Sequence, residues 1–323
     1  MLTDHWVITQ LIGGSCSVIL LVFASFQSIG FIRNWNASKY DEQQLQMERK
    51  TYLLASILQA TLVFQILLLL IFLFTVNIHL PQIIKGAMCA AGTLALNSYG
   101  YPLLFLKMGG VFVYFSFLVL NAIDDKAPDY PLTPKKYWLV FPSMLIALTD
   151  LVFTVLYYVE ISPDIITTCC SLSFSSAKQD AFFQNAVSNF SSTQLIGLHI
   201  GSYLLLAICF FWRKSKLTLL MSLAFTLSSY FAIKYHYIKF IYGLPSHLCL
   251  FDAFNGQYYY VGIWISIGLY GLICLNFYDV LRKTLNLTES SNRRFQVSLF
   301  TFFSILAVGI PISYLLFSGY TFS

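Results

Sequence analysis

Long apolar segments recur along the whole chain and restrict what it can fold into. A helix of about 20 residues rises about 30 Å, the thickness of a bilayer's hydrocarbon core. Lipid offers the backbone no hydrogen-bond partner, and the segments lack the ten-residue alternation of an outer-membrane barrel, so each is predicted to be a helix. The predicted spans are 7–32, 52–77, 101–122, 137–159, 194–212, 217–238, 257–280 and 296–318. The sequence therefore predicts an all-α, polytopic membrane helix bundle of about eight transmembrane helices.

Composition agrees with lipid as the main solvent. Hydrophobic residues make up 58% of the chain and charged residues 10%, against about 45–50% and about 25% in soluble domains. Little length remains outside the spans, so residues 1–323 are predicted to form a single integral membrane domain in contact with the lipid bilayer. The net charge is +5, but the basic residues lie in short loops beside the spans. The sequence therefore predicts no nucleic-acid partner. No Walker, HExxH or GxSxG motif supports hydrolysis of nucleotides or acyl groups.

The basic residues predict the orientation of the bundle. Of the 19 Lys and Arg residues, 14 fall on one side of the predicted spans. By the positive-inside rule that side is cytoplasmic, both termini lie outside the cytoplasm, and the protein is a multi-pass protein of a bacterial inner membrane. Three longer loops, 79–100, 161–193 and 239–256, then face outward. The 14 residues are Arg33, Lys39, Arg49, Lys50, Lys126, Lys135, Lys136, Arg213, Lys214, Lys216, Arg282, Lys283, Arg293 and Arg294.

Four of the seven cysteines fall in the predicted outer loops. The other three lie within spans, where a thiol behaves as a small hydrophobe. In an oxidising compartment, exposed thiols pair, bind metal or exchange electrons. We therefore expect the outer-loop cysteines to converge in space and treat them as redox-active or ligand candidates. They are Cys89, Cys169, Cys170 and Cys249.

Two linked arrangements of these cysteines are open at this point, besides idle thiols. One is a pair of structural disulfides; the adjacent Cys169 and Cys170 would bond to each other only with strain. The other is a redox or metal cluster, which the nearby His79 and His247 favour as further ligands. Thiolate sulfur with imidazole suits copper or zinc, and a thiolate-rich site suits Cu(I). No CxxC pair, haem-attachment motif or zinc-knuckle spacing is present.

Ionisable residues inside the predicted spans form a second candidate site. Lys107 lies roughly 9 Å into the third span, His199 lies at a similar depth in the fifth, and Asp150 lies roughly 20 Å from the cytoplasmic end of the fourth. A carboxylate in hydrocarbon costs about 2.5–3.5 kcal/mol on insertion scales, so Asp150 must face protein or water. Its predicted partner is Lys107 or His199. With His236 near the same surface, these residues are the predicted binding site for a quinone, a metal or protons. The structural alternatives are snorkelling for Lys107 and ordinary core packing for His199.

One loop resembles a known group of proteins. His247-Leu-Cys-Leu-Phe-Asp252, followed by Tyr258-Tyr-Tyr-Val-Gly262, resembles the loop of uncharacterised bacterial multi-span membrane proteins that reads His-x-Cys-Pro-Phe-Cys and then Tyr-x-Tyr-Val-Gly. Leu250 replaces the proline and Asp252 the second cysteine. The departure disfavours a CxxC oxidoreductase but leaves His247, Cys249 and Asp252 able to serve a metal.

The predicted function is thiol redox or soft-metal handling at the outer face, with copper or a quinone as cofactor and a periplasmic redox or metalloprotein as partner. Assistance in maturing that metalloprotein is one form of this function. The first alternative is a transporter or permease that uses Asp150, Lys107 and His199, since charges inside the membrane mark transport paths. The second is a structural or assembly subunit of a membrane complex. The sequence does not decide whether the protein is an enzyme.

Overall fold

The described part of the chain is helical throughout. The computed structural model describes residues 2–35, 42–87, 89–126, 130–161, 191–245, 247–284 and 293–319. Within these ranges there is no strand, and eight helical spans are long and apolar enough to cross a membrane. Each overlaps one predicted span, which confirms the all-α, polytopic architecture. The spans are His5–Asn34, Glu42–Ile83, Gly100–Asp124, Thr133–Glu160, Ser192–Phe211, Ser215–Tyr242, Val261–Thr284 and Arg293–Phe317.

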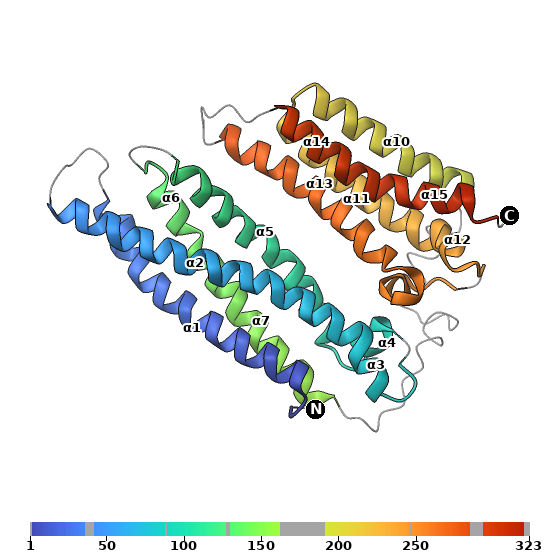
Figure 1. Cartoon of the computed structure of the whole chain (residues 1–323), viewed down its shortest axis with the longest axis horizontal. Helices are drawn as coiled ribbons and strands as arrows, with labels where there is room; N and C mark the ends of the chain where they lie inside the picture. Colours follow the sequence, from blue (N-terminus) through green and yellow to red (C-terminus); the bar gives the residue numbers. More distant parts are fainter. Residues whose placement is uncertain are drawn as a thin grey trace. The chain divides into compact units, whose positions relative to one another are not determined.

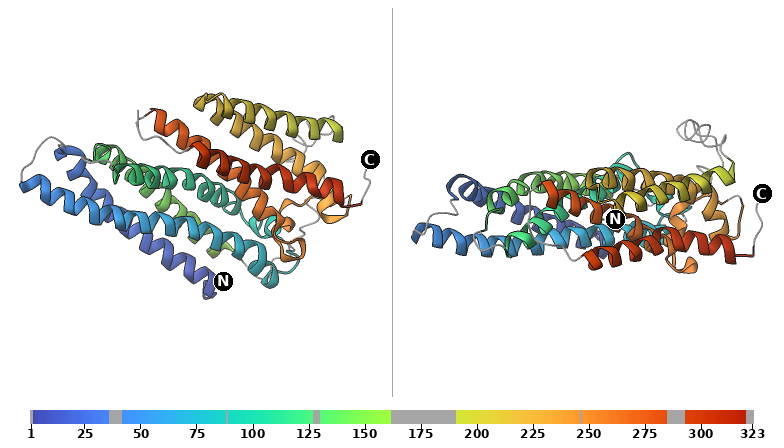
Figure 2. Two further views of the ribbon diagram at one scale, coloured as in Figure 1. Left: turned by 45° about the horizontal axis from the view of Figure 1, so that its top comes forward. Right: turned by 90° about the horizontal axis from the view of Figure 1, so that it is seen from above.

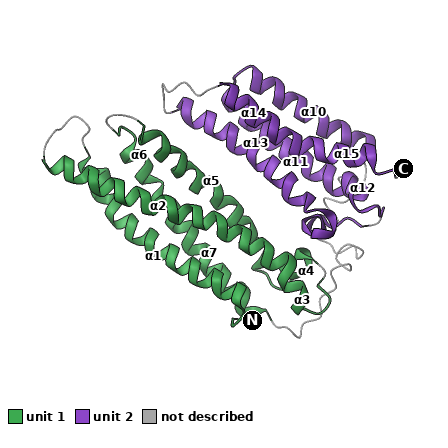
Figure 3. Ribbon diagram, viewed as in Figure 1, with its two compact units in different colours: residues 1–167 green, residues 168–323 purple. Residues whose placement is uncertain are grey.

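The chain divides into two compact units, Met1–Thr167 and Thr168–Ser323 (Figure 3). Each unit contains four of the eight spans, which run side by side within it (Figures 1 and 2). The single integral domain and the outward orientation of the termini stay predictions. The units are described one at a time below.

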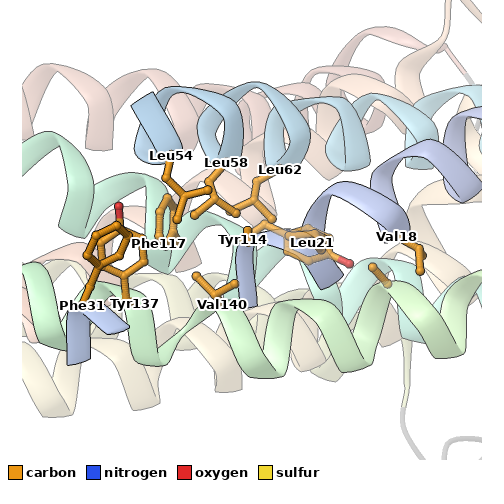
Figure 4. Packing of buried hydrophobic residues seen from close by; sticks show 12 residues of the cluster. Val18, Leu21, Phe31, Leu54, Leu58, Leu62, Tyr114, Phe117, Tyr137 and Val140 are labelled. Atoms are coloured by element: carbon orange, nitrogen blue, oxygen red, sulfur yellow. The ribbon is translucent and has the colours of Figure 1, made fainter. Parts of the chain in front are cut away.

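Unit 1 is a four-span bundle around a core of aliphatic and aromatic side chains. Its long helices are α1 (His5–Asn34), α2 (Glu42–Phe74), α5 (Gly100–Asp124) and α7 (Val140–Glu160), with the short α6 (Thr133–Trp138) preceding α7. Helix α1 packs against both α2 and α7. Leu21, Leu58, Phe117 and Tyr137 are almost fully buried in the core (Figure 4). The apolar face of each helix thus covers its neighbours, while the opposite faces carry exposed apolar side chains suited to lipid.

The second span of unit 1 changes its helical geometry before it ends. Helix α2 continues as the π-helix η1 (Thr75–His79) and then as α3 (Leu80–Ile83). A π turn interrupts the regular pattern of backbone hydrogen bonds, and here side chains of other helices contact it. The Thr93 hydroxyl, on the short helix α4 (Ala90–Leu94), donates to the Val76 carbonyl at 2.6 Å. The Gln10 amide of α1 donates to the Thr75 hydroxyl at 2.8 Å.

Unit 2 shares one feature with unit 1, the interruption of its second span. Its helices are α10 (Ser192–Phe211), α11 (Ser215–Ala232), η2 (Ile233–Tyr237), α12 (Ile238–Tyr242), α13 (Val261–Thr284), α14 (Arg293–Ser304), η5 (Ile305–Gly309) and α15 (Ile310–Phe317). In both units, the second span contains a π turn and a short α-helix. A connection bearing a cysteine, Cys89 or Cys249, then leads to the third span.

Close helix packing in unit 2 depends on a small residue of α13. A Cβ atom at Gly268 would lie 2.6 Å from the Ala307 backbone nitrogen, so α13 and η5 are in backbone contact there.

The π turn η5 immediately precedes helix α15, whose second residue is Pro311. Proline cannot donate a backbone hydrogen bond, and the altered geometry of η5 accommodates that loss.

Candidate functional sites

The connection between α12 and α13 places a carboxylate, Asp252, close to an imidazole and to a thiol in unit 2. His247 Nε2 lies 2.5 Å from Asp252 Oδ2. The Cys249 sulfur lies within 4.8 Å of an Asp252 carboxylate oxygen. The Asp252 side chain is 12% exposed and that of His247 is 29% exposed, so the group opens to solvent on the His247 side. We call His247, Cys249 and Asp252 the loop triad.

The backbone around the loop triad is fixed by contacts with both flanking helices. The Tyr242 hydroxyl, at the end of α12, donates to the Cys249 carbonyl at 2.6 Å. The Tyr242 ring also packs against His247 and Tyr258, with ring centroids 5.0 and 4.4 Å away. Burial raises the pKa of Tyr258, and the Asp252 charge raises it further. The Tyr258 phenol therefore stays neutral near the triad.

A glycine at the start of α13 lets this loop pack closely. A Cβ atom on Gly262 would lie 2.7 Å from a ring carbon of Phe254, which belongs to the 3-10 turn η3 (Leu250–Phe254). Asp252 lies in the same turn. A larger residue at 262 would push η3, and Asp252 with it, off the helix.

Three predicted cysteine ligands lie outside the loop triad. Cys89 is buried and stands immediately before α4 in unit 1, where the Ala90 amide donates to Asn77 Oδ1 at 3.1 Å. Cys169 and Cys170 lie outside the described residues. The convergence of the four outer-loop cysteines stays a prediction.

His79, a predicted metal ligand, contacts a carboxylate in unit 1. Its Nε2 lies 2.6 Å from Asp4 Oδ2. Asp4 also caps α1, because its Oδ1 accepts the Trp6 and Val7 amides at 2.9 and 3.4 Å. Burial favours the neutral carboxyl, but the hydrogen bonds from His79 and the backbone outweigh burial and lower the pKa of Asp4 below 3.8. The pair fastens the beginning of α1 to the end of η1.

This cap predicts a pH-dependent contribution to stability. Asp4→Ala should reduce the free energy of unfolding by about 1 kcal/mol at neutral pH, the usual effect of losing an N-cap. Because the folded-state pKa lies below the unfolded value, the contribution is present above pH 3.8 and is lost as the pH falls through the folded-state pKa. Thermal unfolding of both proteins across that range measures it. A difference that persists unchanged in acid would show that the Asp4 charge is not involved.

Lys107 and Asp150 form an ion pair deep inside unit 1. Lys107 Nζ lies 2.8 Å from Asp150 Oδ2, and the two side chains are 5% and 7% exposed. The contact confirms the predicted pairing of Asp150 with Lys107. The Lys107 ammonium also lies 5.5 Å from the centre of the Phe72 ring. Asp150 Oδ1 is buried without a hydrogen-bond partner among the described residues. The pair joins α5 to α7, with one carboxylate oxygen still able to accept a proton or a donor.

His199 and His236, the other predicted cofactor-binding residues, belong to unit 2. His199 is fully buried, and neither ring nitrogen has a hydrogen-bond partner in the described part of the chain. Its ring packs against Phe225 and Tyr237, with centroids 5.3 and 5.4 Å away. His236, in η2, is 4% exposed and contacts Tyr237 and Phe240. The His199 ring thus lies in an aromatic core, and the roles of His199 and His236 in binding a cofactor stay predictions.

A second buried ion pair in unit 1 escaped the sequence analysis. Lys136 Nζ lies 2.7 Å from Asp124 Oδ2 and donates to Asn121 Oδ1 at 2.8 Å. Asp124 also accepts the Leu132 amide and the Thr133 hydroxyl, each at 2.8 Å. Lys136 is 1% exposed and Asp124 is fully buried. The spacing of Asn121 and Asp124 on one face of α5, shortly before Lys136, is the signal that could have revealed this network.

The fold and these sites define a polytopic α-helical membrane protein with ionisable side chains buried inside its bundles and a thiol-bearing triad on a connecting loop. Comparison with protein-family models, with curated proteins and with solved structures finds no match for this chain.

Proposed function

We propose that the protein handles a soft metal ion, copper(I) by preference, at the loop triad. The observation that carries this proposal is the engagement of His247 Nε2 by Asp252 beside the Cys249 sulfur. A carboxylate commonly holds a ligating imidazole through one nitrogen and leaves the other to bind the metal. His247 Nδ1 and the Cys249 thiolate would then be the ligands, a donor set that suits Cu(I).

Metal handling fits the triad better than dithiol redox chemistry does. A CxxC oxidoreductase needs a second sulfur where this chain carries Asp252. In the loop of the His-x-Cys-Pro-Phe-Cys proteins that this loop resembles, the second cysteine stands where this chain carries Asp252, so the donor set here differs. With the predicted orientation, the triad would face the periplasm of a bacterial inner membrane, and a periplasmic redox or metalloprotein would be the partner that exchanges the ion.

Copper binding to single-site variants tests the proposal. Asp252→Asn should weaken Cu(I) binding by about 10–100-fold, the usual effect of removing a carboxylate that orients a ligand. Cys249→Ser should weaken it at least as much, because it removes a ligand. Competition with a Cu(I) chelator, carried out on the purified full-length protein under reducing conditions, measures both effects.

Cys16→Ser is the matched control, because Cys16 is an exposed thiol on α1, within a span. This variant should bind copper like the unaltered protein. Unchanged affinity in Cys249→Ser, or an equal loss in Cys16→Ser, would contradict the proposed site.

Transport is a second candidate function, and the Lys107–Asp150 pair favours it. Ionisable residues inside membrane spans commonly mark ion or proton paths, and Asp150 Oδ1 has no partner among the described residues. Asp150→Asn keeps the shape of the side chain and removes its charge. In a transporter, this change should impair transport more than it impairs stability.

A further inference from the structure

Unit 1 contains a cavity of about 480 Å³ at the end of the bundle where α1 finishes and α2 begins. Asp125, directly after α5, also lines it. Trp35 follows the last residue of α1, Arg49 and Thr51 lie on α2, and Tyr130 precedes α6; all four line the cavity. The metal and transport proposals do not use it.

Two buried hydrogen-bonding groups in the lining lack partners. The hydroxyl of Thr51, a residue 4% exposed, and the indole N–H of Trp35 are both buried without a partner in the described ranges. Leaving a buried polar group unpaired is unfavourable. Both residues line the cavity and both groups are hydrogen-bond donors, which favours a ligand with acceptor oxygens.

The charges of the lining divide into cationic and anionic groups. Lys136 is held by Asp124 and Asn121, so its charge is already compensated. Arg49 is exposed and has no ion-pair partner among the described residues. Glu48 and Asp125 add carboxylates to the same lining. The lining therefore combines the Arg49 guanidinium and two neutral hydrogen-bond donors with two carboxylates.

The cavity lies where polar sequence gives way to an apolar span. Arg49 and Lys50 precede the predicted span that begins at residue 52, and Tyr52 and Leu53, which also line the cavity, are 67% and 64% exposed. Tyr130 is held with φ 45°, a left-handed conformation that is unfavourable for a non-glycine residue. Aromatic and basic side chains at such a level meet lipid headgroups.

We propose that this cavity binds a phosphorylated amine, the zwitterionic headgroup of an aminophospholipid such as phosphatidylethanolamine. The phosphate would accept hydrogen bonds from Arg49, Thr51 and Trp35. The ammonium would lie toward Glu48 and Asp125. A guanidinium pairs with phosphate through strong charge-assisted hydrogen bonds, and the carboxylates explain why a purely anionic group would fit less well.

Lipid binding to the full-length protein in detergent, followed by native mass spectrometry, tests this site. Phosphatidylethanolamine should bind more tightly than phosphatidylglycerol, and Arg49→Gln should weaken its binding by about 10-fold or more, the usual effect of losing a charged hydrogen bond. Thr51→Val should weaken it less. Lys50→Gln is the matched control, because Lys50 is the next residue on α2, is also exposed and does not line the cavity.

The outcomes separate the site from general electrostatics. Equal losses in Arg49→Gln and Lys50→Gln, or equal affinity for phosphatidylglycerol, would overturn the proposal. Failure of the protein to bind either phosphatidylethanolamine or free phosphoethanolamine would also overturn it. Binding of free phosphoethanolamine with the same dependence on Arg49 would support the proposed chemistry and identify a soluble source. Melting temperatures of the variants show whether each is folded, and Thr51→Val provides a second test should Arg49→Gln fail to fold.

Discussion

Replacing Lys107 with methionine is expected to destabilise the protein by about 3–5 kcal/mol, because the change leaves the Asp150 carboxylate buried without its counter-charge. Methionine keeps most of the length and apolar contact of the lysine stem, so the loss reports mainly on charge. The double variant Lys107→Met/Asp150→Leu should recover most of the stability, since it removes both charges. Unfolding of the purified proteins by heat or denaturant in detergent gives the comparison.

Lys85→Met is the control for this experiment, because Lys85 is exposed near the end of α3. It should change the free energy of unfolding by a few tenths of a kcal/mol. If Lys107→Met were no more destabilising than Lys85→Met, the ion pair would contribute little to the folded state. The proposed role of Asp150 in transport could then be supported only by transport measurements.

Asp124→Ala is expected to have an effect at least as large in the other buried network of unit 1. The change deprives the Lys136 ammonium of its buried counter-charge and removes the acceptor of the Leu132 amide and the Thr133 hydroxyl. Losing one partner of a buried pair destabilises by about 3–5 kcal/mol, and unsatisfied donors add to that figure. The same unfolding measurements apply, with proteolysis of the α5–α6 connection as a local readout.

Asp125 offers the matched control on the adjacent residue. Its carboxylate lies 3.9 Å from Lys136 Nζ and is 41% exposed, so solvent screens the interaction. Asp125→Ala should cost less than about 1 kcal/mol. If the two variants lowered the free energy of unfolding by similar amounts, the burial of Asp124 would not increase its contribution to stability.

The positions of the eight spans could be predicted because hydrocarbon thickness and backbone hydrogen bonding leave one solution for a long apolar segment. The pairing of Asp150 followed from the same reasoning, since an isolated carboxylate at that depth is too costly. The π turns could not be predicted, because they depend on which side chains of other helices reach the freed carbonyls. Thr93 satisfies Val76 across 17 residues of sequence, and no local pattern announces that contact.

The contacts at the candidate sites also separate into those that could be predicted from the sequence and those that could not. His247 and Asp252 lie five residues apart in one loop, so the sequence alone predicts that they can serve the same site. The contact of His79 with Asp4 spans 75 residues and depends on how α1 and η1 pack. Lys136 looked like a loop cation in the sequence, yet it is buried because α6 folds back against the end of α5. Side-chain burial of this kind is a tertiary property.

The π turn η1 also affects how the second span of unit 1 would tolerate a change in length. Successive residues of an α-helix are offset by about 100° around its axis, and a π turn accommodates one residue more than an α turn. Deleting one residue between 75 and 79 would restore a continuous α-helical phase. It would also turn the segments before and after the deletion relative to each other by roughly that angle. Either His79 would then lose its contact with Asp4, or the core face of α2 would turn away from α1. The second span of unit 1 therefore cannot be shortened by even one residue without losing one of these contacts.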